Sequence, residues 1–198
     1  MLTFVSAVIV SYLLGSIPAG YLAGRLAGVD IRKAGSGNIG ATNVLRTGSR
    51  ALAALTLILD CLKATAAILL AKRLFGDASA APAATGAMVG HLYPVWLKFR
   101  GGKGAATLLG VLIGLPLWAA AVVYAVVWIL LLLTFRISSV AGMAAAISAP
   151  IMAAILHSSF FPMLLGFAVL VLWKHRENIA RLTKGTEPRI GSKTSSIA

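Results

Sequence analysis

Residues 105–135 form a continuous run that contains no charged side chain. As a single helix this run would reach about 46 Å at ~1.5 Å per residue, well beyond the ~30 Å hydrocarbon core of a bilayer. Pro116, shortly after Gly114, offers a break because proline cannot donate a helical hydrogen bond. We therefore expect a short or tilted membrane span, a turn near 114–117, and then a full span that ends at Phe135.

The other apolar runs extend this pattern along the chain. Only 12% of the 198 residues are charged and 59% are hydrophobic, whereas a soluble domain has about 25% charged residues. The first run lacks a basic n-region and a small-residue cleavage site, so we interpret it as a retained helix, whose small residues and Pro18 allow close helix packing or a kink. The sequence predicts an all-α, polytopic transmembrane bundle of about seven spans, forming one domain over residues 1–198. Besides the two spans in 105–135, we expect spans at 2–24, 51–71, 80–97, 140–156 and 160–173.

The net charge of +13 would suggest a nucleic-acid partner in a soluble protein. Here the basic residues lie between apolar runs, so the positive-inside rule accounts for much of the excess, and the expected partner is the lipid bilayer rather than nucleic acid. With seven spans, nearly all Lys and Arg residues fall on one side, and only Lys72 and Arg73 on the other. This bias predicts an outside N-terminus and a cytoplasmic C-terminus, with a frayed tail over residues 184–198.

Two charged residues, Asp60 and Lys63, lie within the 51–71 span. An i, i+3 pair shares one helix face, so we expect a mutual salt bridge and expect Asp60 to lie too deep to act on a substrate. The three histidines, His91, His157 and His175, are far apart and have no Cys or carboxylate at ligand spacing, so we expect no metal site. We also expect no other cofactor.

A polar, glycine-rich loop, GSGNIGATNVLR, occupies residues 35–46. Its glycines allow tight turns and exposed N–H groups, and Arg46 adds a planar, permanently charged group, which together suit a phosphate. The spacing also matches G-x-G-x-x-G, but that motif requires a preceding strand in a soluble βαβ unit, and we reject it. A solvated loop that marks the cytoplasmic side is the simpler alternative, and the density of Gly, Asn and Ser argues against it.

Further polar patches follow on the same predicted side. GGKG at residues 101–104 is not a Walker A loop, because the required first Gly and the Ser or Thr after the Lys are absent. Lys103 nevertheless places a point charge between flexible backbone segments that can wrap an anion. The third patch is Arg136 with Ser138 and Ser139, and the fourth is the tail that begins at Lys174. All four patches can converge on one site at one membrane face.

These patches carry a family resemblance. GSGNIGATNVLR, HLYPVWLKFRGGKGAAT, the serine pair and HRENIARLTKGTEPRIG resemble the bacterial acyl-phosphate-dependent glycerol-3-phosphate acyltransferases, the PlsY family, over essentially the whole chain. The resemblance implies a seven-span bundle in the bacterial inner membrane with a cytoplasmic active site. It also implies transfer of a fatty acyl group from acyl phosphate to the 1-hydroxyl of glycerol 3-phosphate, giving lysophosphatidic acid and phosphate in the first step of phospholipid synthesis.

The match of motifs also assigns site residues. It implies that Arg46 and Lys103 hold phosphate with help from the serine pair, and that His175 and Asn178 orient glycerol 3-phosphate. The expected catalytic residues are Ser36, Arg46, Lys103, His175 and Asn178. The expected substrate-binding residues are Gly37, Asn38, Gly40, Asn43, Gly101, Gly102, Gly104, Ser138 and Ser139. Three residues have a structural role as the alternative. Ser139 would cap a helix, His91 would end a helix, and Glu177 would pair with Arg181 at i, i+4.

Acyl phosphate has a good leaving group, so the protein mainly needs positioning and charge stabilisation. No residue five positions after a histidine is Asp, and the absence of H-x-x-x-x-D disfavours an acyl-CoA donor. We expect His175 to orient the attacking hydroxyl and a substrate phosphate to accept its proton. A transporter for a phosphorylated anion is the alternative, although the polar groups cluster on one side and no inverted repeat is visible.

Overall fold

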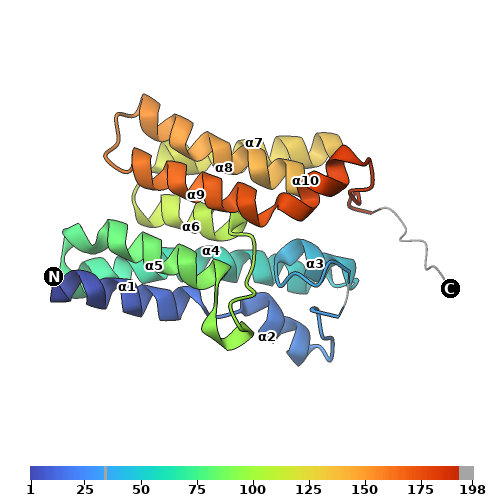
Figure 1. Cartoon of the computed structure of the whole chain (residues 1–198), viewed down its shortest axis with the longest axis horizontal. Coiled ribbons are helices and arrows are strands. Elements are labelled where there is room, and N and C mark those ends of the chain that lie inside the picture. The colour runs from blue at the N-terminus through green and yellow to red at the C-terminus, as the bar shows by residue number, and fades with distance from the viewer. Residues whose placement is uncertain (34, 192–198) are drawn as a thin grey trace.

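The computed structural model describes residues 1–33 and 35–191, and within them every regular element is a helix. The helices pack into an elongated bundle, with Met1 at one end and α2, α3 and α10 at the other (Figure 1). The α-helices are α1 (Leu2–Gly15), α2 (Ala19–Leu26), α3 (Ala41–Arg46), α4 (Arg50–Phe75), α5 (Ala80–Leu92), α6 (Ala105–Gly114), α7 (Trp118–Phe135), α8 (Ser138–Ile155), α9 (Phe161–Lys174) and α10 (Arg176–Thr183). Two short 3₁₀ turns, η1 (Asp77–Ser79) and η2 (Val95–Leu97), flank α5.

The predicted break in the 105–135 run is confirmed, since α6 ends at Gly114 and α7 begins at Trp118. The first apolar run is also divided, into α1 and α2, at Pro18. Within the described residues, four segments are long and apolar enough to cross a membrane, and α6 and α9 are apolar but shorter. Seven spans therefore stays a prediction. The four segments are Leu2–Leu26, Arg50–Phe75, Trp118–Phe135 and Ser138–Ile155.

Small residues bring the helix backbones close together. α1 packs along α5, α4 packs on α6, and α8 packs between α7 and α9. A Cβ atom at Gly90 would overlap the carbonyl oxygen of Tyr12, and one at Gly110 would overlap that of Cys61. Glycine at these contacts permits backbone-to-backbone packing, which drives association where no aqueous phase separates the helices. Many of the fully buried side chains in this core are alanine.

Several helices stop part-way along the bundle. α5 has 13 residues and α6 has 10, about 20 Å and 15 Å at ~1.5 Å per residue, against 26 residues in α4. The loop between α5 and α6 therefore lies beside the middle of α4, where His91 Nδ1 is 3.5 Å from Asp60 Oδ1. This arrangement leaves a hollow between the ends of the short helices and the α2–α3–α10 end of the bundle.

Two partly buried lysines satisfy the ends of these interrupted helices. Lys63 Nζ donates to the Ile17 carbonyl at the break between α1 and α2, and Lys174 Nζ donates to the Leu92 carbonyl at the end of α5. Lys63 also forms the predicted salt bridge with Asp60, at 2.8 Å. Interior breaks in apolar helices require such partners, because lipid offers none.

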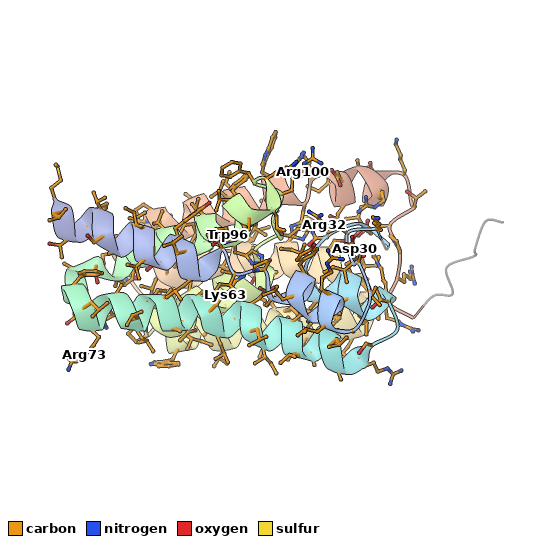
Figure 2. The ribbon with its side chains drawn as sticks, turned by 90° about the horizontal axis from the view of Figure 1, so that it is seen from below. Asp30, Arg32, Lys63, Arg73, Trp96 and Arg100 are labelled. Carbon is orange, nitrogen blue, oxygen red and sulfur yellow. The ribbon has the colours of Figure 1, made fainter. Side chains whose placement is uncertain are left out.

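Charged side chains divide between the two ends of the bundle. Figure 2 shows Arg73 at one end, Arg32 and Arg100 towards the other, and Lys63 near the middle.

The expected fraying of residues 184–198 is wrong for residues 184–191, because Glu187 is buried and the Ile190 N–H donates to the Arg136 carbonyl at 2.7 Å. Residues 192–198 lie outside the described part of the chain.

Candidate active site

One cavity of about 260 Å³ lies where the short helices end. Its wall combines the glycine-rich loop, the loop before α6, the start of α8, and His175 and Asn178 at the α9–α10 junction and in the first turn of α10. Separate polar patches of the sequence therefore meet at one place, as expected. Eleven of the fourteen predicted site residues line it: Ser36, Asn38, Gly40, Asn43, Arg46, Lys103, Gly104, Ser138, Ser139, His175 and Asn178.

The other three predicted residues, Gly37, Gly101 and Gly102, are not among the lining residues, and their close contacts are with protein. A Cβ atom at Gly101 would overlap the His91 carbonyl oxygen, and one at Gly102 would overlap the His91 ring. Gly37 has a φ of 68°, which favours glycine, and lies against the Arg32 carbonyl. These glycines let the two loops turn and approach the helices closely, while the adjacent residues face the cavity.

Internal hydrogen bonds organise the glycine-rich loop. Asn43, which is buried, accepts from the Ser36 N–H at 2.9 Å and hydroxyl at 3.2 Å, and donates to the Ile31 carbonyl at 2.7 Å. The Gly40 N–H donates to Asn38 Oδ1 at 2.8 Å. The N–H groups of Ser36 and Gly40 are therefore engaged within the protein, so the expectation of exposed N–H groups is wrong for these two positions. Asn43 shapes the loop from inside.

A polar network joins the remaining patches. Lys103 Nζ donates to Asn178 Oδ1, and Asn178 Nδ2 donates to Glu187 Oε1 at 2.6 Å. The same oxygen of Glu187 accepts from the Ser139 hydroxyl at 2.7 Å, and Arg181 Nε donates to the other at 2.7 Å. The carboxylate thereby fixes the Asn178 amide, whose oxygen is left facing Lys103.

Glu187 is a member of this network that the sequence did not predict. It lies nine residues beyond Asn178, in a segment that resembles a polar tail and has no helical period to link the two. The expected pairing of Glu177 with Arg181 is wrong, because Arg181 pairs with Glu187. Ser139 does not act as a helix cap either, since its hydroxyl donates to Glu187 inside the site.

Burial and neighbouring charges shift the titration of this network. Burial, and next the Arg181 guanidinium, lower the pKa of Lys103 to about 8. For Glu187, burial would raise the pKa, but hydrogen bonds from Asn178, Ser139 and Arg181 hold it below the usual value. At neutral pH the network thus contains a carboxylate and a partly desolvated ammonium. A bound anion would stabilise the charged form of this ammonium.

His175 is neutral at pH 7. Burial lowers its pKa to about 4, although the hydrogen bond with the Val171 carbonyl opposes this shift. Nδ1 lies 2.8 Å from that carbonyl, which can only accept, so Nδ1 carries the proton. Nε2 is then unprotonated and can accept a hydrogen bond.

The opposite part of the wall is apolar. Leu57 of α4, Leu109 of α6, and Trp128 and Ile129 of α7 line it. Ile129 is 48% exposed and Leu57 is 37% exposed, so the apolar wall continues to the outer surface of the bundle between α4 and α7. An alkyl chain can therefore extend from the cavity along the lipid-facing side of the protein.

Asp60 and His91 also line the cavity, which corrects two expectations. Asp60 lies deep along α4, yet its depth does not separate it from the site. His91 lies near the end of α5, and its ring also contacts the loop that carries Lys103, because it lies against Gly102.

The fold and the cavity define a class: a helical membrane protein whose cationic, glycine-lined site is joined to an apolar surface that faces lipid. The chain belongs to the family described as glycerol-3-phosphate acyltransferase, whose sequence profile matches residues 5–185. Glycerol-3-phosphate acyltransferases of Mesorhizobium japonicum and Brucella anthropi are each 53% identical to it. These alignments cover 94% and 97% of this chain, and 96% of either relative.

Solved structures agree with this placement in the PlsY family. The crystal structure of PlsY, an integral membrane glycerol 3-phosphate acyltransferase, in its glycerol 3-phosphate form superposes with a TM-score of 0.89 and is 38% identical, covering 95% of this chain and 96% of the other. The lysophosphatidic acid form gives a TM-score of 0.87 and 37% identity, covering 95% of each chain.

Proposed function

We propose that this protein transfers a fatty acyl group from acyl phosphate to the 1-hydroxyl of glycerol 3-phosphate, releasing lysophosphatidic acid and inorganic phosphate. The observation that carries the proposal is a single cavity in which phosphate-binding groups and an alkyl-binding wall meet. Both substrates carry a phosphate, and only the donor carries a long chain. Solved PlsY structures in glycerol 3-phosphate and lysophosphatidic acid forms support the same acceptor and product.

The reaction forms one ester bond and breaks one anhydride bond. The 1-hydroxyl oxygen attacks the acyl carbon, and the carbon–oxygen bond to phosphate breaks with its electron pair on the phosphate. Arg46 and Lys103 would neutralise the charge that grows on the leaving phosphate, in a site partly shielded from water. The hydroxyl proton would pass to a substrate phosphate, so that atoms and charge balance without an added reactant.

His175 would hold the attacking hydroxyl. Its Nε2 can accept a hydrogen bond from that hydroxyl and direct a lone pair of the oxygen towards the acyl carbon. A pKa of about 4 makes His175 a weak final proton acceptor, while phosphate has a second pKa of ~6. The geometry therefore favours orientation by His175 and proton transfer to phosphate.

The donor is tested directly with purified protein. We expect release of phosphate and formation of lysophosphatidic acid from acyl phosphate and glycerol 3-phosphate, undiminished by a chelator, and no turnover when acyl-CoA replaces acyl phosphate. The reason is that the site offers groups suited to phosphate, and the chain lacks the H-x-x-x-x-D motif that acyl-CoA-dependent acyltransferases use. Equal rates with both donors, or loss of activity to the chelator, would contradict the proposed donor chemistry.

We further propose that the site faces the cytoplasm of a bacterium, with the chain in the inner membrane. In a Cys61→Ser background, cysteines at Ser36 or Lys184 should resist an impermeant thiol reagent in intact cells, because the positive-inside bias places both inside. A cysteine at Asp77, which is exposed at the opposite end, is the positive control and should be labelled. Labelling at Ser36 or Lys184 before cell lysis would refute this orientation.

A further inference from the structure

Two polar side chains at the inner end of the cavity have no role in the proposed reaction. Asp60 from α4 and His91 from α5 line the wall, with side chains only 5% and 4% exposed. Asp60 Oδ1 and His91 Nδ1 have no hydrogen-bond partner of good geometry among the described residues, although Lys63 Nζ lies 2.8 Å from Asp60 Oδ1. Unsatisfied polar atoms at such burial are uncommon and call for a partner.

The spacing of these two atoms suits one added oxygen. At 3.5 Å, Nδ1 and Oδ1 are too far apart for a strong direct hydrogen bond, and close enough for a single hydroxyl to contact both. A hydroxyl can donate to the carboxylate and accept from an imidazole N–H. A carbonyl has no hydrogen to donate, and the negative charge of a phosphate would be repelled by Asp60.

The position of the pair also limits which hydroxyl it can meet. The His91 ring lies against Gly102, next to Lys103, so this end of the cavity adjoins the phosphate-binding side. A cavity of about 260 Å³ is below the ~300–1,000 Å³ of common ligand pockets, so its polar groups are within reach of one small molecule. Glycerol 3-phosphate has two hydroxyls, and His175 is proposed to hold the one that reacts.

We propose that Asp60 and His91 form a subsite that binds the non-reacting hydroxyl, on carbon 2, of the acceptor. This inference rests on the proposed function and adds the basis on which the site selects its acceptor. Lys63, which pairs with Asp60 and donates to the Ile17 carbonyl, holds the carboxylate in position. The subsite would favour acceptors with a hydroxyl at carbon 2 over those with a methylene or a carbonyl there.

The test compares two acceptors on the same protein sample. Glycerol 3-phosphate and 3-hydroxypropyl phosphate, which lacks only the carbon-2 hydroxyl, are each offered with acyl phosphate. For the unmodified protein we expect the ratio of kcat/KM values to favour glycerol 3-phosphate by roughly 10- to 100-fold, as for a hydrogen bond to a charged group. Dihydroxyacetone phosphate, with a carbonyl at carbon 2, should be disfavoured to a similar degree.

Variants assign the preference to the pair. Asp60→Asn should lower the ratio several-fold, and Asp60→Ala/Lys63→Met, which leaves no unpaired buried charge, should bring it within about threefold of one. Asp77→Asn, an exposed acid at the opposite end, should keep the original ratio. Because each ratio is measured on one sample, partial misfolding cancels. Should the variants lack turnover, the ratio of calorimetric Kd values for the two acceptors replaces it, with the same expectation.

Two results would overturn the inference. One is a ratio near one in the unmodified protein, and the other is an unchanged ratio in both Asp60 variants, as expected if a water molecule fills the gap. Absence of turnover with acyl phosphate and glycerol 3-phosphate in the unmodified protein would instead refute the proposed function, and this inference with it.

Discussion

Replacing Lys103 with Ala should lower kcat/KM by roughly 10²- to 10³-fold, the effect of removing one preorganised group that stabilises charge in a transition state. Lys103 is the cation that the Asn178–Glu187 network holds at the cavity wall. Burial disfavours its charged form, so loss of the ammonium should not reduce stability. Initial rates with both substrates, together with the thermal midpoint in detergent, measure the two effects separately.

Arg46 should behave like Lys103, with one difference. Arg46→Ala should lose activity to a similar degree, and Arg46→Lys should recover little, because an ammonium cannot reproduce two parallel N–H donors. Arg100→Ala and Arg50→Ala, which remove exposed cations near each residue, should retain nearly full activity and serve as matched controls. Near-normal turnover in Lys103→Ala or Arg46→Ala would reduce that residue to a marker of membrane orientation.

The pH dependence provides an internal check on Lys103. Its pKa is lowered to about 8, so the charge that holds phosphate is present below this pH and is lost as the pH rises through it. The kcat/KM value should therefore fall on the alkaline side near pH 8. Lys103→Arg should move this limb to higher pH, because a guanidinium stays protonated.

The convergence of the site could be predicted because membrane topology reduces the problem to two faces. The charge bias places the loops at 35–46 and 98–104 on one side of the membrane, so residues that are far apart in sequence lie at the same end of the bundle. The break before Trp118 was predictable for a related reason, since an uncharged run of that length exceeds the bilayer. The break and the convergence of the loops both follow from the length of the apolar runs and the positions of the charges, which can be read directly from the sequence.

What could not be predicted depends on contacts across the bundle. Glu187 meets Ser139 and Asn178 only because the segment after α10 folds back, and no local pattern marks that return. The short α3 in the second half of the glycine-rich loop was missed as well. Asp60 was expected to lie out of reach because a bilayer was assumed to fill its depth. Because α5 and α6 end early, the cavity instead extends inward as far as Asp60.

His175→Gln should reduce kcat/KM by roughly 10²- to 10⁴-fold, whether His175 orients the hydroxyl or removes its proton. The size of the loss does not separate the two roles. The position of the acidic limb does, because kcat/KM reports groups of the free enzyme and free substrate. Burial lowers the pKa of His175 to about 4, so a base at this residue is active above pH 4 and fails only as the pH falls through it.

A substrate phosphate that accepts the proton would place the limb near pH ~6 instead. We expect the limb near 6, in both the unmodified protein and His175→Gln, with a lower amplitude in the variant. His157→Gln, which removes an exposed histidine at the opposite end of the bundle, should leave both rate and profile unchanged. A limb near pH 4 that disappears in His175→Gln, while both substrates still bind, would make His175 the base. The lone pair on Nε2, left free by the Nδ1 contact with the Val171 carbonyl, would then be the proton acceptor.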